Sequence, residues 1–452
     1  MDGSMAVLTT TRSTLPTEQG HRIRIIVFPN PPEFYNAGDT AMLQTTVSRF
    51  QELWPDAVIQ VRTSDPDGLQ RHCPNTEPLP SKELLTGMAR RSHLGRLSPL
   101  FPWLASGLHR AARLEVRLGC KVKGTKVPGQ EAFLGEIRRA DLAVVSGMGV
   151  LTDCFKYSAN QVLSFLASAI QCGVPAVALG QGIGPVQDEG LSARMQTVLP
   201  QLALIALRES RAGLPLLRGL GVPRSRIIVT GDDAIELAFR RRTVEIGNGL
   251  GVNIRVGPSS EMDNETVGTI RDVILDVTQE IGAPMIPVVI NQHSSCSDKD
   301  TVHSLFAAYQ GLWRGKLQQS QPAEVIRDAS RCRLVVTGSY HGAVFALSQG
   351  IPSVCFAKSR YYADKFLGLR EQFGVGCTVL LLDKCVDTEQ FRQTILNSWE
   401  SATHVRPSLL AAAQRQIEKS RQVYRSLERF ITKETASRQV PLEEVTPGGS
   451  DE

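Results

Sequence analysis

The chain has 452 residues, of which 42% are hydrophobic and 21% are charged. This length is too great for one comfortable globular domain and predicts two α/β domains, each with its own core. The net charge of +5 is small for a nucleic-acid-binding protein, and no nucleic-acid-binding motif occurs. Nine scattered cysteines form no CxxC pair, which predicts reduced thiols in the cytoplasm and neither a disulfide framework nor a metal site.

No segment of the sequence predicts export or membrane insertion. The first twenty residues lack the apolar core of a signal peptide, and no later stretch reaches the ~20 apolar residues that span a bilayer. Both ends of the chain, 1–21 and 433–452, lack hydrophobic periodicity, so we expect them to be disordered. The sequence therefore predicts a soluble protein.

The first half of the chain alternates strand and helix patterns. Ile23–Phe28 predicts a buried strand, and a helix is expected to start at Asp39, whose side chain would cap free backbone amides. This alternation predicts a parallel Rossmann-like domain over 22–237, with the polar strand ends at one edge of its sheet. The further predicted strands are Ala57–Val61, Ala140–Gly149, Pro175–Gly184, Leu202–Ser210 and Arg226–Asp233.

The segment 74–129 interrupts the first domain and is predicted to be a basic insertion. Between Pro80 and Gly129, the acidic residues are only Glu83 and Glu115. Apolar side chains among the basic ones would let this segment rest on an anionic membrane surface, at the inner face of the membrane. The alternative is a solvated basic helix face whose apolar cluster packs on the first domain. The sequence leaves both interpretations open.

The second half repeats the same pattern after a charged segment, 238–248, that is expected to be a hinge. A second Rossmann-like domain is predicted over 249–432, closed by two helices. Its predicted strands are Leu250–Val256, Pro284–Ile290, Cys332–Gly338, Pro352–Ala357 and Cys377–Leu382. The predicted fold class is therefore α/β, with two doubly wound Rossmann-like domains that face a cleft, the glycosyltransferase-B type.

A histidine follows one strand of the second domain, in the sequence LVVTGSYHG. Ser339 is expected to cap the next helix, and His341 lies in the first turn of that helix. Helix amides favour a phosphate or carboxylate there, and an imidazole can exchange a proton near neutral pH. The alternative is a histidine that is hydrogen-bonded in the core. Its position at a Gly-flanked strand end favours function.

Two arginines follow strands. Arg208, in ALRES, could grip an anionic ligand with two parallel hydrogen bonds, or it could pair with a carboxylate on the rim. Arg255, in GVNIR, has a similar position in the second domain. Each arginine is therefore a candidate to bind an anionic ligand.

Glycine-containing loops follow three strands of the first domain, where the backbone could approach a ligand closely. Together they favour a sugar or nucleotide cleft over plain sharp bends. No HExxH, GxSxG or Walker motif occurs, which argues against zinc proteases, α/β-hydrolases and P-loop enzymes. The residues of these loops that we expect to contact substrate are Asn36, Asp39, Gly147, Gly149, Asp153 and Gly182.

These motifs, taken in order, resemble those of the polysaccharide pyruvyl transferase family, members of which place a pyruvate ketal on cell-surface sugars. The similarity covers most of Ile23–Leu382 apart from the insertion. The motifs that carry it are NAGD, ADLAVVSGMGVLTD, ALGQGIGP, ALRESRAGLPLLRGLGV, IIVTGDDAIEL and TGSYHGAVFALSQGIPSV.

The resemblance implies a phosphoenolpyruvate site formed by Arg208 and His341, with His341 in proton transfer or phosphate binding. Some members have an arginine where this chain has Ser339, and Arg255 or Lys358 could supply the missing cation. Asp39 and Asp153 would orient acceptor hydroxyls. Asp232 and Tyr340 complete the set of expected substrate-binding residues.

The resemblance also implies the reaction. The donor substrate would be phosphoenolpyruvate, the acceptor a sugar or lipid-linked oligosaccharide, and no further cofactor is expected. Two alternatives share the predicted fold, a nucleotide-sugar-dependent glycosyltransferase and a non-catalytic sugar-binding protein. Phosphate release from phosphoenolpyruvate would distinguish a pyruvyl transferase from both alternatives.

Overall fold

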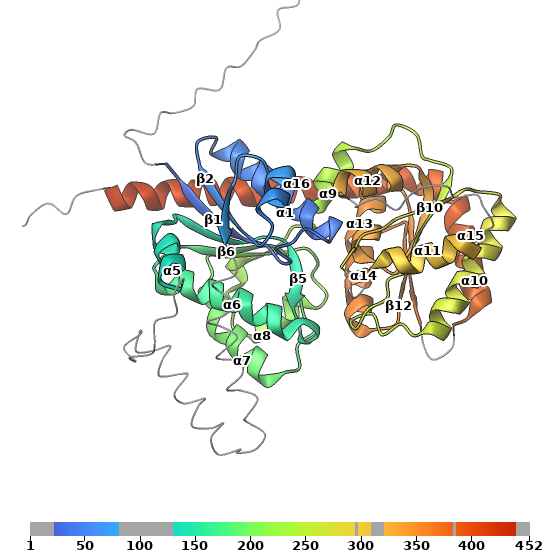
Figure 1. The fold of residues 1–452 in the computed structure, drawn as a ribbon, viewed down its shortest axis with the longest axis horizontal. Coiled ribbons are helices and arrows are strands. Elements are labelled where there is room, and N and C mark those ends of the chain that lie inside the picture. Colours follow the sequence, from blue (N-terminus) through green and yellow to red (C-terminus); the bar gives the residue numbers. More distant parts are fainter. Residues whose placement is uncertain (1–21, 81–129, 294–296, 309–320, 383–385, 440–452) are drawn as a thin grey trace, which may run out of the picture.

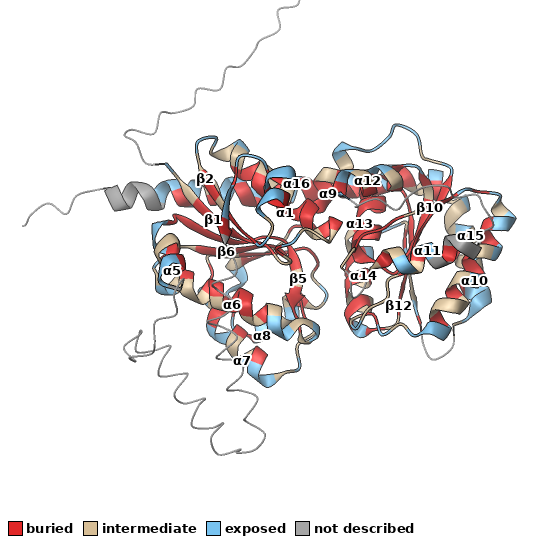
Figure 2. Cartoon of the chain, viewed as in Figure 1, coloured by how far each residue is buried: buried red, intermediate tan, exposed pale blue. Residues whose placement is uncertain are grey.

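The computed structural model describes residues 22–80, 130–293, 297–308, 321–382 and 386–439. Within these ranges the chain forms two parallel sheets, each covered by helices on both faces (Figure 1). The two sheets and the helix faces against them are the buried part of the molecule (Figure 2).

The first sheet has eight described strands in the order β3-β2-β1-β4-β6-β7-β8, with β5 paired to β6. Every pairing is parallel, so the carboxyl ends of the strands meet at one edge. The strands are β1 (Arg24–Phe28), β2 (Val58–Thr63), β3 (Glu77–Pro80), β4 (Leu142–Val145), β5 (Met148–Leu151), β6 (Ala176–Ile183), β7 (Leu204–Leu207) and β8 (Ile227–Val229).

Helices cover both faces of this sheet because its strands are apolar on both sides. One face packs against α1 (Ala37–Leu53) and α2 (Pro66–His72). The other face is covered by α5 (Gln130–Arg139), α6 (Lys156–Gln171), α7 (Glu189–Val198) and α8 (Gly213–Gly219). Short 3₁₀ turns lie at Asp153–Phe155, Leu199–Gln201 and Arg224–Arg226.

The second sheet has five described strands, all parallel, in the order β10-β9-β11-β12-β13. The strands are β9 (Gly249–Asn253), β10 (Met285–Pro287), β11 (Cys332–Thr337), β12 (Ser353–Ala357) and β13 (Cys377–Leu381). On one face lie α10 (Asn264–Ile281), α11 (Asp298–Ala308) and α15 (Thr388–Glu400). On the other lie α9 (Ala234–Arg240), α12 (Pro322–Ser330), α13 (Tyr340–Ser348) and α14 (Arg360–Phe373).

The last helix, α16 (Ala402–Gln439), joins the two domains (Figure 1). Its first half packs in the second domain through Leu409 and Ala413. Its second half packs on the first domain, where Tyr424 and Leu427 enter the core beside α1. The start of α1 also contributes Ala37 to the apolar core of the second domain, so the two domains share buried surface.

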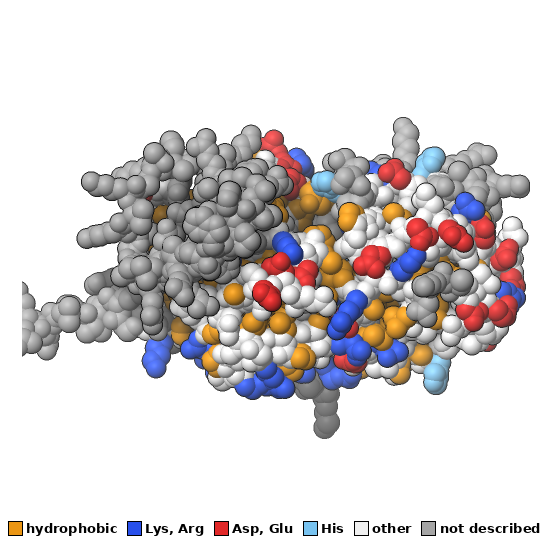
Figure 3. Space-filling view, turned by 90° about the horizontal axis from the view of Figure 1, so that it is seen from below, with side chains coloured by type: hydrophobic (Ala, Val, Ile, Leu, Met, Phe, Trp, Pro, Cys, Tyr) orange, Lys and Arg blue, Asp and Glu red, His pale blue; other side chains and the backbone are white. Residues whose placement is uncertain are grey.

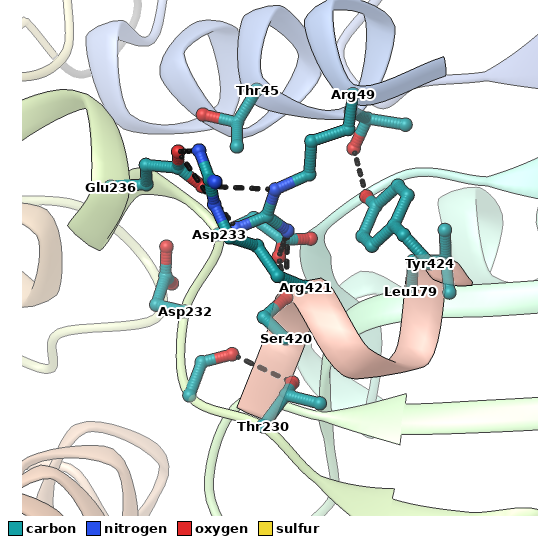
Figure 4. Close-up of polar contacts among 12 residues, drawn as sticks. Thr45, Arg49, Leu179, Thr230, Asp232, Asp233, Glu236, Ser420, Arg421 and Tyr424 are labelled. Carbon is teal, nitrogen blue, oxygen red and sulfur yellow. Dashed lines mark hydrogen bonds and ion pairs between the residues drawn. The ribbon is translucent and has the colours of Figure 1, made fainter. Parts of the chain in front are cut away.

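A buried polar cluster fixes the point where α1, α9 and α16 meet (Figure 4). Arg49 of α1 donates to Glu236 through Nε and Nη2, at 3.1 and 2.7 Å, and its Nη1 donates to Asp233 at 2.8 Å and Ser420 at 2.7 Å. The Arg49 guanidinium also lies 4.7 Å from the ring centre of Tyr424. We call Arg49, Asp233, Glu236, Ser420, Arg421 and Tyr424 the Arg49 cluster.

Several predicted boundaries differ from the structure. Helix α1 begins at Ala37, and Asn36 rather than Asp39 caps it, because the Asn36 side chain accepts from the amides of Gly38 and Asp39. Residues Glu77–Pro80, predicted to lie in the insertion, form the edge strand β3. Helix α9 occupies the start of the predicted hinge, up to Arg240, and α16 continues to Gln439 through the start of the predicted disordered tail.

The remainder of the basic insertion, 81–129, lies outside the described residues, so its contact with a membrane stays a prediction. Among the helices that the structure does describe, none is both long and apolar enough to cross a bilayer. On the face shown in Figure 3, both basic and acidic side chains are spread over the visible surface of the described residues.

Candidate functional site

The carboxyl edge of the first sheet faces helices α13 and α14 of the second domain. A group of charged and aromatic side chains from both domains meets there. Arg208 follows β7, Asp232 follows β8, and Asp39 lies in the first turn of α1. We call this group the interdomain cluster: Asp39, Arg208, Asp232, Tyr340, His341, Tyr361 and Lys365.

Arg208 lies at the centre of the cluster. Its side chain is 1% exposed, and Nη1 is 3.4 Å from Oδ2 of Asp232. The guanidinium lies 4.3 Å from the ring centre of Tyr340, a cation–π contact that joins the two domains. Among the described residues, no hydrogen-bond acceptor lies against the buried Nε. Because a buried guanidinium normally has acceptors for its N–H groups, Arg208 has donor capacity left for an anionic ligand.

Two of the predicted glycines make room for Arg208. A Cβ atom at Gly149 would lie 2.5 Å from Nη2 of Arg208, and one at Gly182 would lie 2.7 Å from Nε. Either substitution would displace the guanidinium. Gly147 instead packs against α1, since a Cβ atom there would lie 1.9 Å from Cε of Met42. The close approach predicted for these glycines is therefore to protein side chains.

His341 lies in the first turn of α13, as predicted. Its Nε2 is 3.5 Å from Oδ2 of Asp232 and makes no hydrogen bond among the described residues. Its ring also lies against α1, because a Cβ atom at Gly38 would be 2.0 Å from Cγ and Nδ1 of His341. Burial opposes ionisation of Asp232, but contact with His341 and the charge of Arg208 outweigh burial and lower the pKa of this carboxyl.

The residues before His341 have separate roles. Ser339 occupies the cap position of α13, but its side chain makes no capping hydrogen bond, so the predicted cap is wrong in this detail. The Ser339 amide instead donates to Oγ1 of Thr337, at 2.9 Å. Tyr340 is 3% exposed and stacks on Arg208. The residue that follows Ser339 therefore supplies an aromatic ring to Arg208.

The second cation of the cluster is Lys365, which sequence reasoning missed. Lys365 is 9% exposed on α14, and its Nζ lies 3.7 Å from the ring centre of Tyr361 and bonds the Tyr361 hydroxyl. Tyr361 in turn donates to the carbonyl of Gly149 at 2.8 Å, which ties α14 to β5. Burial and the nearby charge of Arg208 lower the pKa of Lys365 well below its ordinary value.

A signal for Lys365 was present in the sequence. Ser359 follows the strand β12 and accepts a hydrogen bond from the amide of Tyr362, which is the cap of α14. The segment YYADKF then places Tyr361 and Lys365 four residues apart, on one face of a helix. Because α14 itself was not predicted, these side chains were not assigned to the same edge as His341.

Asp39 lies in the cluster, although it does not cap α1. It is partly exposed, and the charges of His341, Arg208 and Lys365 act on it. Burial raises the pKa of its carboxyl, and this effect exceeds the opposing effect of the three cations. The Asn36 side chain caps α1, and the Asn36 backbone forms an isolated β-bridge with Asn291 of the second domain.

The other predicted binding residues lie outside the cluster. The Asp153 carboxylate accepts from the amides of Gln187 and Asp188, at 2.6 and 3.2 Å, and so holds the loop after β6. The two cations proposed to replace an arginine at Ser339 are paired in the second domain, Arg255 with Asp298 at 2.8 Å and Lys358 with Asp263.

Arg255 and Lys358 do line the same shallow depression at the carboxyl ends of β9, β11 and β12. Its other lining residues are Ser260, Met262, Gly338, Phe356, Ala357 and Tyr362. This depression lies on the second domain alone, whereas the interdomain cluster draws side chains from both domains. In the described ranges, no group of three or more His, Cys, Asp or Glu side chains is arranged to hold a metal ion.

Comparison with solved structures defines the class of fold. The chain is similar to a putative UDP-N-acetylglucosamine 2-epimerase from Listeria monocytogenes, with a TM-score of 0.54 and 10% identity over 91% of this chain and 98% of that one. It is also similar to a glycosyltransferase from Rickettsia africae, with a TM-score of 0.53 and 8% identity over 92% and 100%. These likenesses confirm the predicted glycosyltransferase-B type of fold with two Rossmann-like domains.

The family of this chain is shown by comparison of its sequence with a family model. A sequence model described as polysaccharide pyruvyl transferase matches residues 36–360, which include every member of the cluster except Tyr361 and Lys365. The chain belongs to the polysaccharide pyruvyl transferase family. No curated protein matches it at the threshold applied.

Proposed function

We propose that this protein transfers pyruvate from phosphoenolpyruvate to a sugar of a cell-surface polysaccharide or its precursor, forms a cyclic ketal and releases phosphate. Membership of the family supports a transferase that acts on polysaccharide. The observation that supports the donor is the interdomain cluster, in which Arg208, His341 and Lys365 approach one another from facing domains. Such a group of cations suits a small ligand with several negative charges.

Arg208 is proposed to anchor the donor. Its unpaired Nε and its weak 3.4 Å contact with Asp232 leave a planar fork that can bind a carboxylate or phosphate through two hydrogen bonds. Lys365 would bind the same anion as a point charge. A bound anion stabilises an ammonium group, so donor binding would raise the lowered pKa of Lys365 and draw a proton from solvent.

Transfer to the sugar requires three chemical events. A proton is added to the methylene carbon of phosphoenolpyruvate, a sugar hydroxyl attacks the electron-poor carbon beside it, and phosphate leaves as a second hydroxyl closes the ketal. His341 would bind the phosphate or move a proton, and Arg208 with Lys365 would stabilise the charge of the leaving phosphate. The burial of these groups strengthens their interaction with a charged ligand.

The acceptor is proposed to be a sugar or a lipid-linked oligosaccharide that reaches the cluster from between the domains. A cytoplasmic enzyme, in contact with the inner face of the membrane through the basic insertion, would meet a lipid-linked acceptor there. Two solved structures of similar fold are UDP-N-acetylglucosamine 2-epimerases, one of them putative, and a nucleotide-sugar-dependent glycosyltransferase is therefore the alternative outcome of the test.

The test is phosphate release from phosphoenolpyruvate in the presence of a panel of lipid-linked and nucleotide-linked sugars. We expect acceptor-dependent release by the wild type, and a methyl signal of the ketal on the product by NMR. The variant Arg208→Met should lose this activity. The control is Arg194→Met, which alters a half-buried arginine that bonds Asn160 on the outer helices. Binding of uridine or guanosine nucleotides without phosphoenolpyruvate turnover would favour the glycosyltransferase instead.

A further inference from the structure

Asp39 differs from the other charged side chains of the interdomain cluster because its carboxyl is not engaged. It is the third residue of α1, held there by the bond between its amide and Asn36 at 3.2 Å. Among the described residues, no hydrogen bond or ion pair engages the Asp39 carboxyl. The residue is partly exposed, whereas Arg208 and His341 are buried. A half-buried carboxyl without a partner, beside Arg208, Lys365 and His341, is placed to act on a ligand.

The pKa values of the two carboxyls of the cluster are shifted in opposite directions. Asp232 is buried, but its contacts with His341 and Arg208 lower its pKa, so it stays an anion. Asp39 has no such bonds, and burial raises its pKa against the effect of the same cations. A pair of groups whose pKa values diverge in this way is typical of sites in which one group donates a proton and the other stays charged.

The geometry of His341 supports this division of roles. Its Nε2 faces Asp232 at 3.5 Å, and its Nδ1 side lies against the backbone of α1 at Gly38. The ring is therefore held between a carboxylate and a helix, which suits a fixed group that binds phosphate. Asp39 lies one residue further along α1 and is only half-buried.

We propose that Asp39 is the catalytic acid that protonates the methylene carbon of the donor, an inference that rests on the proposed function. The carboxyl proton is transferred to the methylene carbon, and the electron pair of the double bond forms the new C–H bond. The oxygen of the first sugar hydroxyl then bonds to the adjacent carbon, and its proton returns to the Asp39 carboxylate. Phosphate departs with the electron pair of its C–O bond, the second hydroxyl closes the ketal, and that proton leaves with phosphate.

Donor binding helps to keep this acid protonated. A trianion beside Asp39 disfavours a further negative charge there, and so raises the pKa of the carboxyl further. Turnover needs the protonated form, so the rate should fall as pH rises through the pKa of Asp39 in the bound complex. This alkaline decrease should disappear when residue 39 cannot ionise.

The experiment compares Asp39→Asn and Asp39→Glu with the wild type and with Asp300→Asn. Asp300 is an exposed aspartate that is also the third residue of its helix, α11, so its variant controls for the loss of charge at a helix start. We expect Asp39→Asn to lower kcat by about 100-fold or more and to lose the alkaline decrease. The KM for phosphoenolpyruvate should change by less than about threefold. Asp39→Glu should recover part of kcat, and Asp300→Asn should match the wild type.

A second readout does not depend on turnover. The infrared difference spectrum of wild type minus Asp39→Asn, each saturated with inorganic phosphate in heavy water, should show the carbonyl band of a protonated carboxyl. Absence of this band, or Asp39→Asn turnover within about threefold of the wild type, would overturn the role of Asp39 alone. A wild type that shows the band but consumes no phosphoenolpyruvate with any acceptor would overturn the proposed reaction, and the role of Asp39 with it.

Discussion

Two buried arginines of the first domain have opposite surroundings. Arg49 donates to three partners, Glu236, Asp233 and Ser420, and each of its nitrogens has an acceptor at 3.1 Å or less (Figure 4). Arg208 has one carboxylate contact, at 3.4 Å, and its Nε has no acceptor among the described residues. Their carboxylate partners, Asp233 and Asp232, are adjacent in the sequence and serve different clusters.

This difference separates a structural site from a binding site. A buried guanidinium with all of its hydrogen bonds made within the protein holds helices together and has little left to offer a ligand. A buried guanidinium with unmade hydrogen bonds carries a free-energy cost that an anionic ligand can relieve. The Arg49 cluster is therefore expected to control stability, and the interdomain cluster to control activity.

Arg208→Lys is expected to have a large effect on activity. A lysine keeps the positive charge but cannot reproduce the two-pronged contact, so the variant should lose about 2–5 kcal/mol of donor binding or transition-state stabilisation. Steady-state kinetics of phosphate release measure this loss, and thermal unfolding should stay close to that of the wild type. Unchanged kcat and KM for phosphoenolpyruvate would show that Arg208 is a structural arginine like Arg49.

Arg49→Met should reverse this pattern. Loss of the Arg49 side chain leaves the buried Asp233 without its arginine partner and leaves Glu236 with only Arg421 and Arg240, which should reduce the free energy of unfolding by about 3–5 kcal/mol. Denaturant unfolding measures this change. Because the cluster lies apart from the donor, kcat of the protein that remains folded should be close to that of the wild type. A stable Arg49→Met protein with a large loss of donor affinity would contradict the comparison.

The Arg49 cluster should also give stability a defined pH dependence. Although Glu236 is buried, its bonds with Arg421 and Arg49 lower its pKa from 4.5 to about 2. A carboxyl whose pKa is lower in the folded state stabilises the protein above its unfolded pKa, and this contribution is lost as pH falls from about 4.5 to about 2. Acid unfolding of wild type and Glu236→Gln should therefore differ most above pH 4.5 and converge near pH 2.

The smallest expected effect is that of Ser420→Ala. Its hydroxyl accepts from Arg49 and donates to Asp233 at 2.8 Å, and both of these charged groups keep a direct bond with each other in the variant. We expect a loss of about 1 kcal/mol in the free energy of unfolding, measured in denaturant. A loss comparable with that of Arg49→Met would mean that the hydroxyl, rather than the ion pair, organises the cluster.

The sequence predicted most of the architecture, because apolar runs and helical periodicity follow directly from burial in a doubly wound fold. The five strands predicted for the second domain all occur, as β9, β10, β11, β12 and β13. The predictions that were wrong include the start of a helix, which depends on single polar side chains. The start of α1 depends on which of two neighbouring polar side chains reaches the free amides, and Asn36, with its extended backbone, does so rather than Asp39.

The candidate site was predicted in part for a similar reason. Arg208 and His341 follow strong strand patterns, so their positions at sheet edges were readable from the sequence. Lys365 lies five residues into a helix that was not predicted, and only the three-dimensional packing of α14 on β5 brings it to Arg208. Likewise, Asp232 and Asp233 are indistinguishable in sequence, and their division between two clusters depends on the direction of each side chain.

The most direct measurement of the central claim is a calorimetric titration of phosphoenolpyruvate into the wild type, Lys365→Met and Arg194→Met, each in two buffers of different ionisation enthalpy. If the donor binds at the interdomain cluster, the wild type and Arg194→Met should bind it and take up a proton at pH values between the pKa of Lys365 in the free protein and its higher pKa in the complex, because the anion raises the lowered pKa of Lys365. Lys365→Met should bind more weakly and take up fewer protons. Equal affinity and equal proton uptake in all three proteins would contradict a donor site at this cluster.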